Sequence, residues 1–261
     1  MSTGLALLPL KMALAASVVV SCSMLAERAG PLMAAMIATL PISLGPVLVF
    51  LALDHGPDFI AGAALGTMNA NATHASFVLS YVLLAQRHGV VASLGGALAI
   101  WTVLLLALRS MALPVLPLTM LTVLALFVVH QLVRPYLKVR AKPPAGISRY
   151  AIPIRAACVA ALVGIVTGLS ERVGPQWSGI LAGLPIILSS LIIILHTRAG
   201  GPAAAAVIGS SALGLLGAGL GLAAVHLAAV PWGSWTALGL GLAIAVIWNL
   251  ILLGLARRSA P

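Results

Sequence analysis

Residues 27–31 read Glu-Arg-Ala-Gly-Pro, and residues 171–175 read Glu-Arg-Val-Gly-Pro. Leu40-Pro41-Ile42 recurs in the same way as Leu184-Pro185-Ile186, at the same offset of 144 residues (171 − 27 and 184 − 40). Charged residues make up only 7% of the chain, so a repeated Glu-Arg pair followed by Gly-Pro indicates internal duplication more strongly than matched apolar residues do. Internal repeats with a proline inside matching hydrophobic segments are typical of secondary transporters.

The composition predicts an integral membrane protein. Hydrophobic residues make up 62% of the chain and the mean hydropathy is +1.17, whereas a soluble domain carries about 25% charged residues. A helix needs about 20 apolar residues to cross a bilayer. Nine segments fit this length: about 4–26, 31–53, 59–86, 89–108, 112–133, 151–170, 176–197, 201–228 and 233–256. We therefore expect an all-α polytopic fold of about nine transmembrane helices.

The nine segments divide into two units of four with one helix between them. Residues 1–110 hold the first repeat, residues 111–150 hold the connecting helix and a basic linker, and residues 151–261 hold the second repeat. Equivalent helices are five spans apart, and five is odd, so the two repeats are expected to cross the membrane in opposite directions. This predicts inverted repeats related by a pseudo-two-fold axis in the membrane plane.

The basic residues predict the orientation. Five of them surround the central linker: Arg134, Lys138, Arg140, Lys142 and Arg149. The positive-inside rule places this linker in the cytoplasm, which gives an external N-terminus, a cytoplasmic C-terminus and a location in the inner (cytoplasmic) membrane. The basic residues that then fall outside are Lys11, Arg109 and Arg172, together with three of the four acids.

Matched prolines are the first candidate for a binding site. Pro41 and Pro185 lie near the centres of equivalent spans, and Ser43 and Ser189 follow them. Proline inside a helix removes a backbone hydrogen bond, and in lipid the freed carbonyl must find protein or water in a cavity. Two broken helices meeting at mid-membrane would form a substrate or ion site. The alternative is a structural kink in each helix.

Lys11 and Arg155 are the second candidate, because they are equivalent in the two repeats and each follows a proline by two residues. A charge within the bilayer is costly and marks a functional site by default. Such a pair would favour an anionic cargo in a central cavity. The alternative is that both side chains extend to the headgroups.

The run from Gly66 to Ser76 is the third candidate, because it places six polar side chains within one predicted transmembrane helix. We expect Asn69, Asn71 and His74 to contact the cargo, since the second repeat has no matching polar residues. Interhelical hydrogen bonding is the alternative.

The repeated Glu-Arg pairs and the spaced glycine pairs each have a structural and a functional interpretation. Glu27-Arg28 and Glu171-Arg172 precede Gly-Pro, and they are interpreted either as local ion pairs or as gates at the two membrane faces. Three glycine pairs are spaced four residues apart, which lets helix backbones approach closely or slide; they are Gly62/Gly66, Gly179/Gly183 and Gly217/Gly221.

Enzymatic activity, a cofactor, a metal site and nucleic-acid binding are not expected. The chain has no HExxH, GxSxG or Walker A motif, and only four carboxylates. Catalytic acid–base chemistry and divalent-cation binding both need such groups. The basic residues also form no single patch with interleaved aromatic residues.

Four helices per unit, two inverted units and a helix between them resemble the small multidrug resistance and drug/metabolite transporter group. The resemblance covers nearly the whole chain but is architectural, without a diagnostic motif. It implies alternating access. Small multidrug resistance proteins use a glutamate within their first helix, whereas the equivalent helix here carries Lys11 and ends at Glu27, so export of cationic drugs is not implied.

We therefore predict a secondary transporter for a small anionic or polar metabolite. The alternatives are a lipid or lipid-linked-sugar flippase and a non-transporting membrane scaffold subunit. The expected partners are the bilayer, a small-molecule substrate and, as an option, a second copy of the chain in a homodimer.

Overall fold

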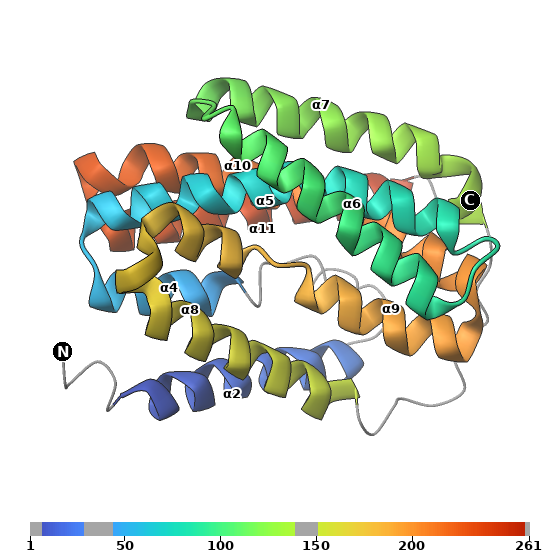
Figure 1. Ribbon diagram of the computed structural model, residues 1–261, viewed down its shortest axis with the longest axis horizontal. Coiled ribbons are helices and arrows are strands. Elements are labelled where there is room, and N and C mark those ends of the chain that lie inside the picture. The colour runs from blue at the N-terminus through green and yellow to red at the C-terminus, as the bar shows by residue number, and fades with distance from the viewer. Residues whose placement is uncertain (1–6, 29–43, 139–150, 259–261) are drawn as a thin grey trace.

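The computed structural model describes residues 7–28, 44–138 and 151–258, and the regular structure in these ranges is entirely helical. The prediction of an all-α fold is thus confirmed for the described residues. The helix axes are roughly aligned in one bundle, some helices running parallel and others antiparallel (Figure 1). Their bounds are α2 (Leu8–Arg28), α4 (Leu44–Asp54), α5 (Pro57–Leu84), α6 (Val90–Ser110), α7 (Val115–Val133), the 3₁₀ helix η1 (Arg134–Lys138), α8 (Ala151–Ala182), α9 (Ile186–Ala199), α10 (Gly201–Trp232) and α11 (Ser234–Arg258).

Five helical stretches among the described residues are long and apolar enough to cross a membrane. They are Val90–Ser110, Val115–Leu137, Ile152–Ala199, Gly201–Trp232 and Ser234–Leu255. The apolar helices Leu8–Ser21 and Leu44–Asp54 are shorter. Helix α5 has 28 residues but is not among the five, because its polar run lowers its hydropathy. A membrane protein is therefore indicated, while the count of nine spans stays a prediction.

The segment from 151 to 199 turns back on itself and then breaks. Helix α8 reverses at Gly174, whose φ of 76° is a value that glycine adopts without strain. The helix that resumes at Pro175 ends at Ala182, and α9 begins only at Ile186. The second predicted span of this repeat is thus discontinuous, and its break at Gly183–Pro185 contains the proline that the sequence singled out.

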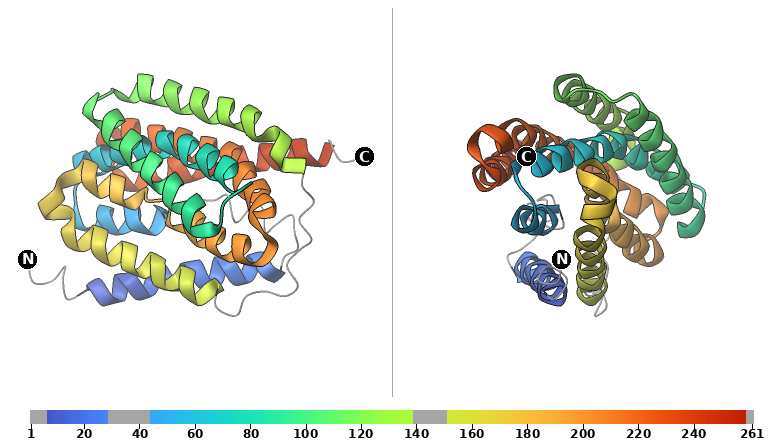
Figure 2. Two further views of the ribbon diagram at one scale, coloured as in Figure 1. Left: turned by 45° about the vertical axis from the view of Figure 1, so that its right-hand side comes forward. Right: turned by 60° about the vertical axis from the view of Figure 1, so that its left-hand side comes forward.

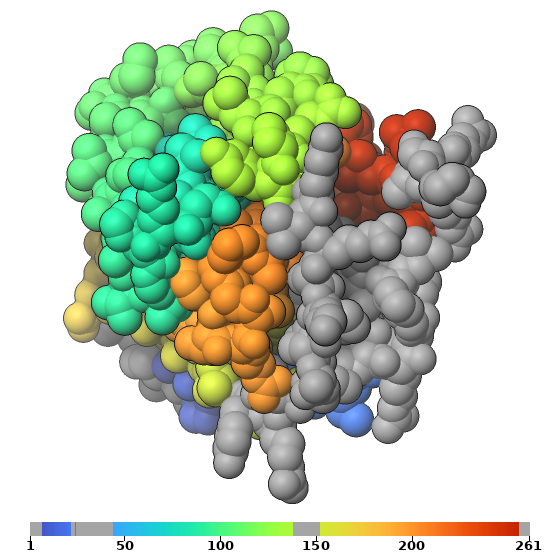
Figure 3. All heavy atoms as spheres, turned by 90° about the vertical axis from the view of Figure 1, so that its right-hand side faces the viewer, coloured from blue at the N-terminus to red at the C-terminus, as the bar shows by residue number. Residues whose placement is uncertain are grey.

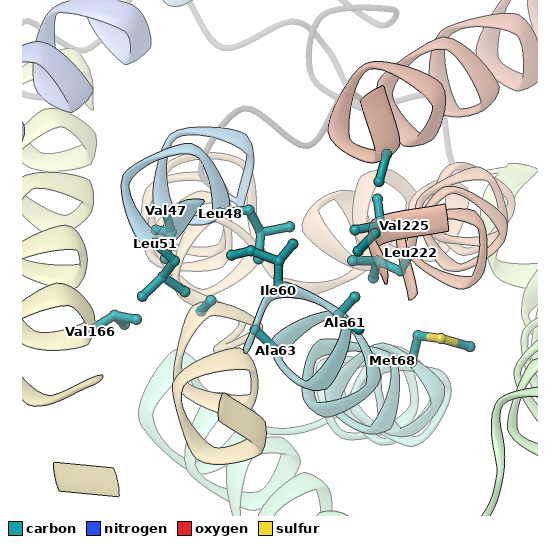
Figure 4. Packing of buried hydrophobic residues seen from close by; sticks show 14 of the residues in the cluster. Val47, Leu48, Leu51, Ile60, Ala61, Ala63, Met68, Val166, Leu222 and Val225 are labelled. Atoms are coloured by element: carbon teal, nitrogen blue, oxygen red, sulfur yellow. The ribbon is translucent and has the colours of Figure 1, made fainter. Parts of the chain in front are cut away.

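Helix α5 is the centre of the bundle. It packs against α4, α6, α7, α8 and α10, and every residue from Gly66 to Ala75 is buried. Helices α7 and α2 lie on opposite sides of the bundle (Figure 2). Near one end of α5, Leu48 of α4 and Ile60 of α5 point toward one another, with Leu222 and Val225 of α10 beyond them (Figure 4).

Helices that the sequence repeat makes equivalent pack against each other and run antiparallel. In α2 and α8, Leu8 contacts Gly168 and Met12 contacts Gly164. In α5 and α10, His226 Nδ1 is hydrogen-bonded to the Ala61 carbonyl oxygen, and Asn71 Nδ2 donates to the Leu215 carbonyl oxygen. The helix starts also recur at the offset of the repeat, since α10 begins 144 residues after α5 (201 − 57) and α11 begins 144 residues after α6 (234 − 90).

The bundle has two chemically different ends. The connections α4–α5, α6–α7 and α10–α11 lie at the left in Figure 1. We call this the acidic end because the acids Asp54, Asp58 and Glu171 are found there, although Lys11, Arg109 and Arg172 lie at the same end. The connections α5–α6 and α9–α10 and the helix η1 lie at the opposite, basic end, with Arg87, Arg134 and Arg198. Figure 3 looks onto this basic end, where these segments lie side by side.

The spaced glycines mark close helix contacts. A Cβ atom at Gly179 would overlap the carbonyl oxygen of Ala63, and one at Gly66 would overlap the carbonyl of Gln176. Gly217 lies against Trp248, and Gly221 against the backbone of Gly241. All three glycine pairs therefore serve close packing in this conformation, whether or not the same surfaces slide in another.

We predict that Gly179→Ala lowers the stability of the protein by about 1–3 kcal/mol, because the added methyl group forces α5 and α8 apart. The matched control is Gly95→Ala in α6, where a Cβ atom meets nothing within 4 Å and alanine favours the helix by ~1 kcal/mol. Thermal unfolding of the detergent-purified variants measures both. Equal stability of the two variants would contradict the close α5–α8 contact.

Candidate functional site

Five polar side chains on α5 form what we call the central cluster: Thr67, Asn69, Asn71, Thr73 and His74. All are buried, none being more than 8% exposed. They lie in the middle of α5, where α5 packs on residues 175–182 of α8 and on α10. The predicted cargo residues Asn69, Asn71 and His74 are thus brought to the interior of the bundle.

Two members of the central cluster bind neighbouring helices. The Thr67 hydroxyl group lies 2.9 Å from the carbonyl oxygens of both Ala63 and Gly179. Asn71 donates from Nδ2 to the Leu215 carbonyl of α10 at 3.1 Å. Asn71 and Leu215 are 144 residues apart, so this bond joins equivalent positions of the two repeats.

Two other members carry polar atoms without a hydrogen-bond partner. Asn69 donates from Nδ2 to the Leu65 carbonyl at 3.0 Å, but its buried Oδ1 accepts no hydrogen bond. His74 packs on Trp101 with 6.0 Å between ring centroids, and its Nδ1 is also unpartnered. The two atoms lie on different faces of α5, since the residues are five positions apart. Buried polar atoms in folded proteins are rarely left without a partner.

The side of α5 that carries Asn69 is polar further along the helix, toward the basic end. Asn69, Thr73, Ser76 and Ser80 recur at i, i+4, i+7 and i+11, which places them on one side of the helix. The three hydroxyl groups each donate to a carbonyl of α5 itself. Because the donors are used, this face offers acceptor atoms to any molecule that contacts it.

The helix break adjoins the central cluster. A Cβ atom at Gly183 would lie 2.6 Å from the Cβ of Ala70, so the break meets α5 between Thr67 and Asn71. Pro185 is buried and Ser189 half-buried, while the Ser190 hydroxyl group donates to the Ile187 carbonyl at 2.8 Å. The equivalent Pro41 and Ser43 lie outside the described residues.

Lys11 is buried in an ion pair. Its ammonium group lies 2.5 Å from both carboxylate oxygens of Asp54, and its side chain is only 7% exposed. The sequence predicts Lys11 either as a cation in a central cavity or as a side chain that extends to the headgroups. Neither prediction includes an ion pair with Asp54. Arg155 is half-buried near the start of α8, at the opposite end of the bundle, so the two basic residues do not meet.

Of the two Glu-Arg pairs predicted as gates, the structure describes the side chains of one. Glu171 and Arg172 are exposed at the acidic end, and within the described ranges neither forms a salt bridge. Helix α2 ends at Arg28, but the side chains of Glu27 and Arg28 lie outside the described part. Another basic residue at this end is held internally, because the Arg109 guanidinium lies 4.2 Å from the ring centroid of Trp177.

Sequence reasoning did not identify Asp54, Trp101 and Trp177 as partners of the candidate residues. Asp54 carried a usable signal, because an isolated acid at the end of a predicted span near an isolated lysine invites pairing. Trp101 and Trp177 carried none, since their contacts depend on how α6 and α8 pack. Among the described residues, no group of three His, Cys, Asp or Glu side chains is placed to hold a metal ion.

We predict that Asp54→Asn destabilises the protein more than Lys11→Met does. The first leaves a charged lysine that is almost fully buried, whereas the second leaves a carboxylate whose side chain is 27% exposed. Both losses should stay below the ~3–5 kcal/mol of a fully buried broken pair. The double variant Lys11→Met/Asp54→Asn should be less destabilised than the sum of the two single variants. Thermal unfolding tests this, with exposed Asp58→Asn as control, and additive single effects would contradict a direct pair.

A pH prediction follows from His55, in the connection between α4 and α5. Its Nε2 lies 2.8 Å from the Ser170 hydroxyl oxygen, and its ring stacks on Phe59. Burial lowers the pKa of His55 below 6.5, although Asp54 and Glu171 act in the opposite direction. Neutral His55 therefore contributes stability above pH 6.5, and this contribution is lost as the pH falls through the lowered pKa.

The measurement is the unfolding temperature between about pH 7.5 and 5, on either side of the ordinary histidine pKa. Wild-type protein should lose stability over this range, and His55→Gln should lose less. Parallel curves for the two proteins would show that His55 does not carry the pH dependence.

Comparison with protein-family models, curated proteins and solved structures finds no match to this chain. The resemblance to the small multidrug resistance and drug/metabolite transporter group therefore stays a prediction, and the function must be argued from the site itself.

Proposed function

We propose that the protein is a membrane transporter that moves a small polar metabolite by alternating access. The site would comprise the Asn69 face of α5, while the break at Gly183–Pro185 meets the same helix on another side, at Thr67 and Ala70. The observation that carries the proposal is the unpartnered Oδ1 of Asn69, buried within an apolar bundle. An unsatisfied buried acceptor costs about 1–3 kcal/mol, and a cargo or water that donates a hydrogen bond would remove this cost.

The packing of equivalent helices supports the alternating-access part of the proposal. Inverted repeats exchange roles when such a transporter changes the side to which it opens. Inverted repeats require equivalent helices to run in opposite directions, and the antiparallel pairs α2/α8 and α5/α10 are consistent with this. The bond from Asn71 to Leu215 joins equivalent positions, and equivalent points of a two-fold arrangement can touch only near its axis. The axis would therefore pass close to the central cluster.

The charges favour a neutral polar cargo over an anionic one. The anionic option needs Lys11 as a free cation, but Asp54 neutralises it. The Asn69 face, in contrast, offers acceptors, which suit the hydroxyl or amino groups of a metabolite.

We propose that the protein lies in the inner (cytoplasmic) membrane with its basic end toward the cytoplasm. Arg87, Arg134 and Arg198 lie at the basic end. The residues that would face outward include Lys11 and Arg109, and both are held by internal partners. The positive-inside rule supports this assignment.

We predict that Asn69→Leu stabilises the ligand-free protein and abolishes its response to cargo. Leucine already occupies the equivalent position, as Leu213, and it removes an acceptor that nothing satisfies. The test is a thermal-unfolding screen of neutral polyols, amines, amino acids, small anions and lipid phosphates at millimolar concentration. A ligand that binds the folded form raises its apparent stability.

A neutral polar ligand that stabilises wild-type protein but not Asn69→Leu would support the proposal. Thr102→Val, on the exposed face of α6, is the control and should respond like wild type. The proposal fails if Asn69→Leu destabilises the protein and every ligand response is unchanged. A screen in which nothing binds would favour the scaffold alternative.

Lipid translocation is the second candidate function, because one observation favours it. An apolar groove opens on the side of the bundle between α4, α10 and α11, and a flippase needs such a path for a hydrocarbon tail. Stabilisation by lipid phosphates alone, lost in Arg155→Gln, would favour this candidate.

A further inference from the structure

An apolar groove lies between α4, α10 and α11, with a volume of about 260 Å³. Every lining residue is hydrophobic or a glycine. Leu48 of α4 and Leu222 and Val225 of α10 form its inner wall (Figure 4). The outer wall is α11, where five of the six lining residues are spaced at i, i+3, i+4, i+7 and i+10: Trp235, Leu238, Gly239, Leu242 and Ala245, with Gly241 as the sixth.

The groove exists because the second half of the chain carries small residues where the first half carries large ones. Ala218, Gly221 and Ala245 line it, and the residues 144 positions earlier are His74, Phe77 and Trp101. In the first half these three side chains are buried against one another, with His74 between Phe77 and Trp101. In the second half the α11 backbone lies against Gly221, where a Cβ atom would be 2.5 Å from the Gly241 carbonyl oxygen, whereas Ala218 and Ala245 leave the volumes of the His74 and Trp101 side chains without a counterpart. Small residues of the second half therefore open the groove, and α4 of the first half supplies its remaining wall with Leu44, Gly45, Leu48 and Val49.

The groove opens toward the surroundings of the bundle, not toward its polar interior. Val49, Trp235 and Leu242 line it and are 37%, 56% and 54% exposed. In a bilayer these exposed apolar surfaces face hydrocarbon. The groove follows α11 from Trp235 to Ala245, which is about 15 Å at 1.5 Å per residue. This length matches one leaflet, since the whole hydrocarbon core is about 30 Å thick.

The chemistry of the groove selects a hydrocarbon chain. An apolar cavity of about 150 Å³ stays dry and accepts benzene, and this groove is larger. A polar metabolite would lose its hydrogen bonds to water without replacing them there. Acyl chains, by contrast, surround the opening at very high local concentration.

We propose that this groove binds one acyl chain of a bilayer lipid, with the headgroup at the acidic end, beside the start of α11. Tryptophan at this depth suits the boundary between headgroups and hydrocarbon, which is where Trp235 would lie. The bound chain takes the place beside Ala218 and Ala245 that the His74 and Trp101 side chains take in the other half. This site is separate from the Asn69 face and does not depend on the proposed transport activity.

The test compares two glycines on the same helix. A Cβ atom at Gly239 or at Gly254 meets nothing within 4 Å, and both residues are exposed on α11, but only Gly239 lines the groove. Gly239→Leu should fill it, and Gly254→Leu adds the same side chain elsewhere. The detergent-purified full chain is titrated with palmitoyl-oleoyl-phosphatidylcholine, and thermal unfolding and native mass spectrometry report bound lipid.

We expect wild-type protein and Gly254→Leu to retain one more lipid than Gly239→Leu, and the rise in unfolding temperature with lipid to be at least halved in Gly239→Leu. Glycerophosphocholine, which has the headgroup without acyl chains, should not stabilise any of them. Equal lipid retention in the two leucine variants, or stabilisation by glycerophosphocholine alone, would overturn the proposal. If Gly239→Leu does not fold, Ala245→Phe, which imitates Trp101, decides in the same way.

The outcome is distinguishable from failure of the transport proposal. Asn69→Leu leaves the groove unchanged and should keep the full lipid response. A lipid response lost in Asn69→Leu but kept in Gly239→Leu would place the lipid at the central cluster and contradict the groove site.

Discussion

The cost of placing amide, hydroxyl and imidazole groups in hydrocarbon determines the arrangement of this bundle. Helix α5 carries these groups in its middle, and a polar group in lipid without a partner is expensive. Five helices accordingly surround α5, and glycines let α8 approach it until Thr67 reaches the Gly179 carbonyl. Where packing does not satisfy a polar atom, as at Asn69 Oδ1, the remaining cost identifies the place where a ligand would be favoured.

The two halves of the chain share a pattern of helix starts but differ in what they bury. The first half has polar and aromatic residues on α5 and α6, including Asn69, His74 and Trp101. The second half has Leu213, Ala218 and Ala245 at the same positions. With this difference, the first half holds a buried polar cluster, and an apolar groove lies between α4, α10 and α11. The two halves thus share helix starts but offer different kinds of surface.

Much of the fold could be predicted from the sequence, because hydrophobic length and the Glu-Arg-Gly-Pro repeat are local signals. The helix ends near Gly56, Gly89 and Gly233 and the break at Pro185 agree with the predicted spans. The Lys11–Asp54 pair could not be derived with certainty, since the residues are 43 positions apart and their meeting depends on how α2 and α4 pack. The groove could not be predicted from the sequence either, because it depends on how α4, α10 and α11 pack together.

The most direct test of the account is whether water reaches the Asn69 face of α5 within the membrane. Cys22 and Cys158 are first replaced by alanine, and a single thiol is then introduced on that face by Ser76→Cys. The control is Thr102→Cys, on the exposed face of α6. In vesicles, a charged, membrane-impermeant thiol reagent should modify the Ser76→Cys variant and leave the Thr102→Cys variant unmodified, because thiolate forms only where water is present. Equal lack of reaction in both variants would show a dry, sealed bundle and contradict a polar transport site.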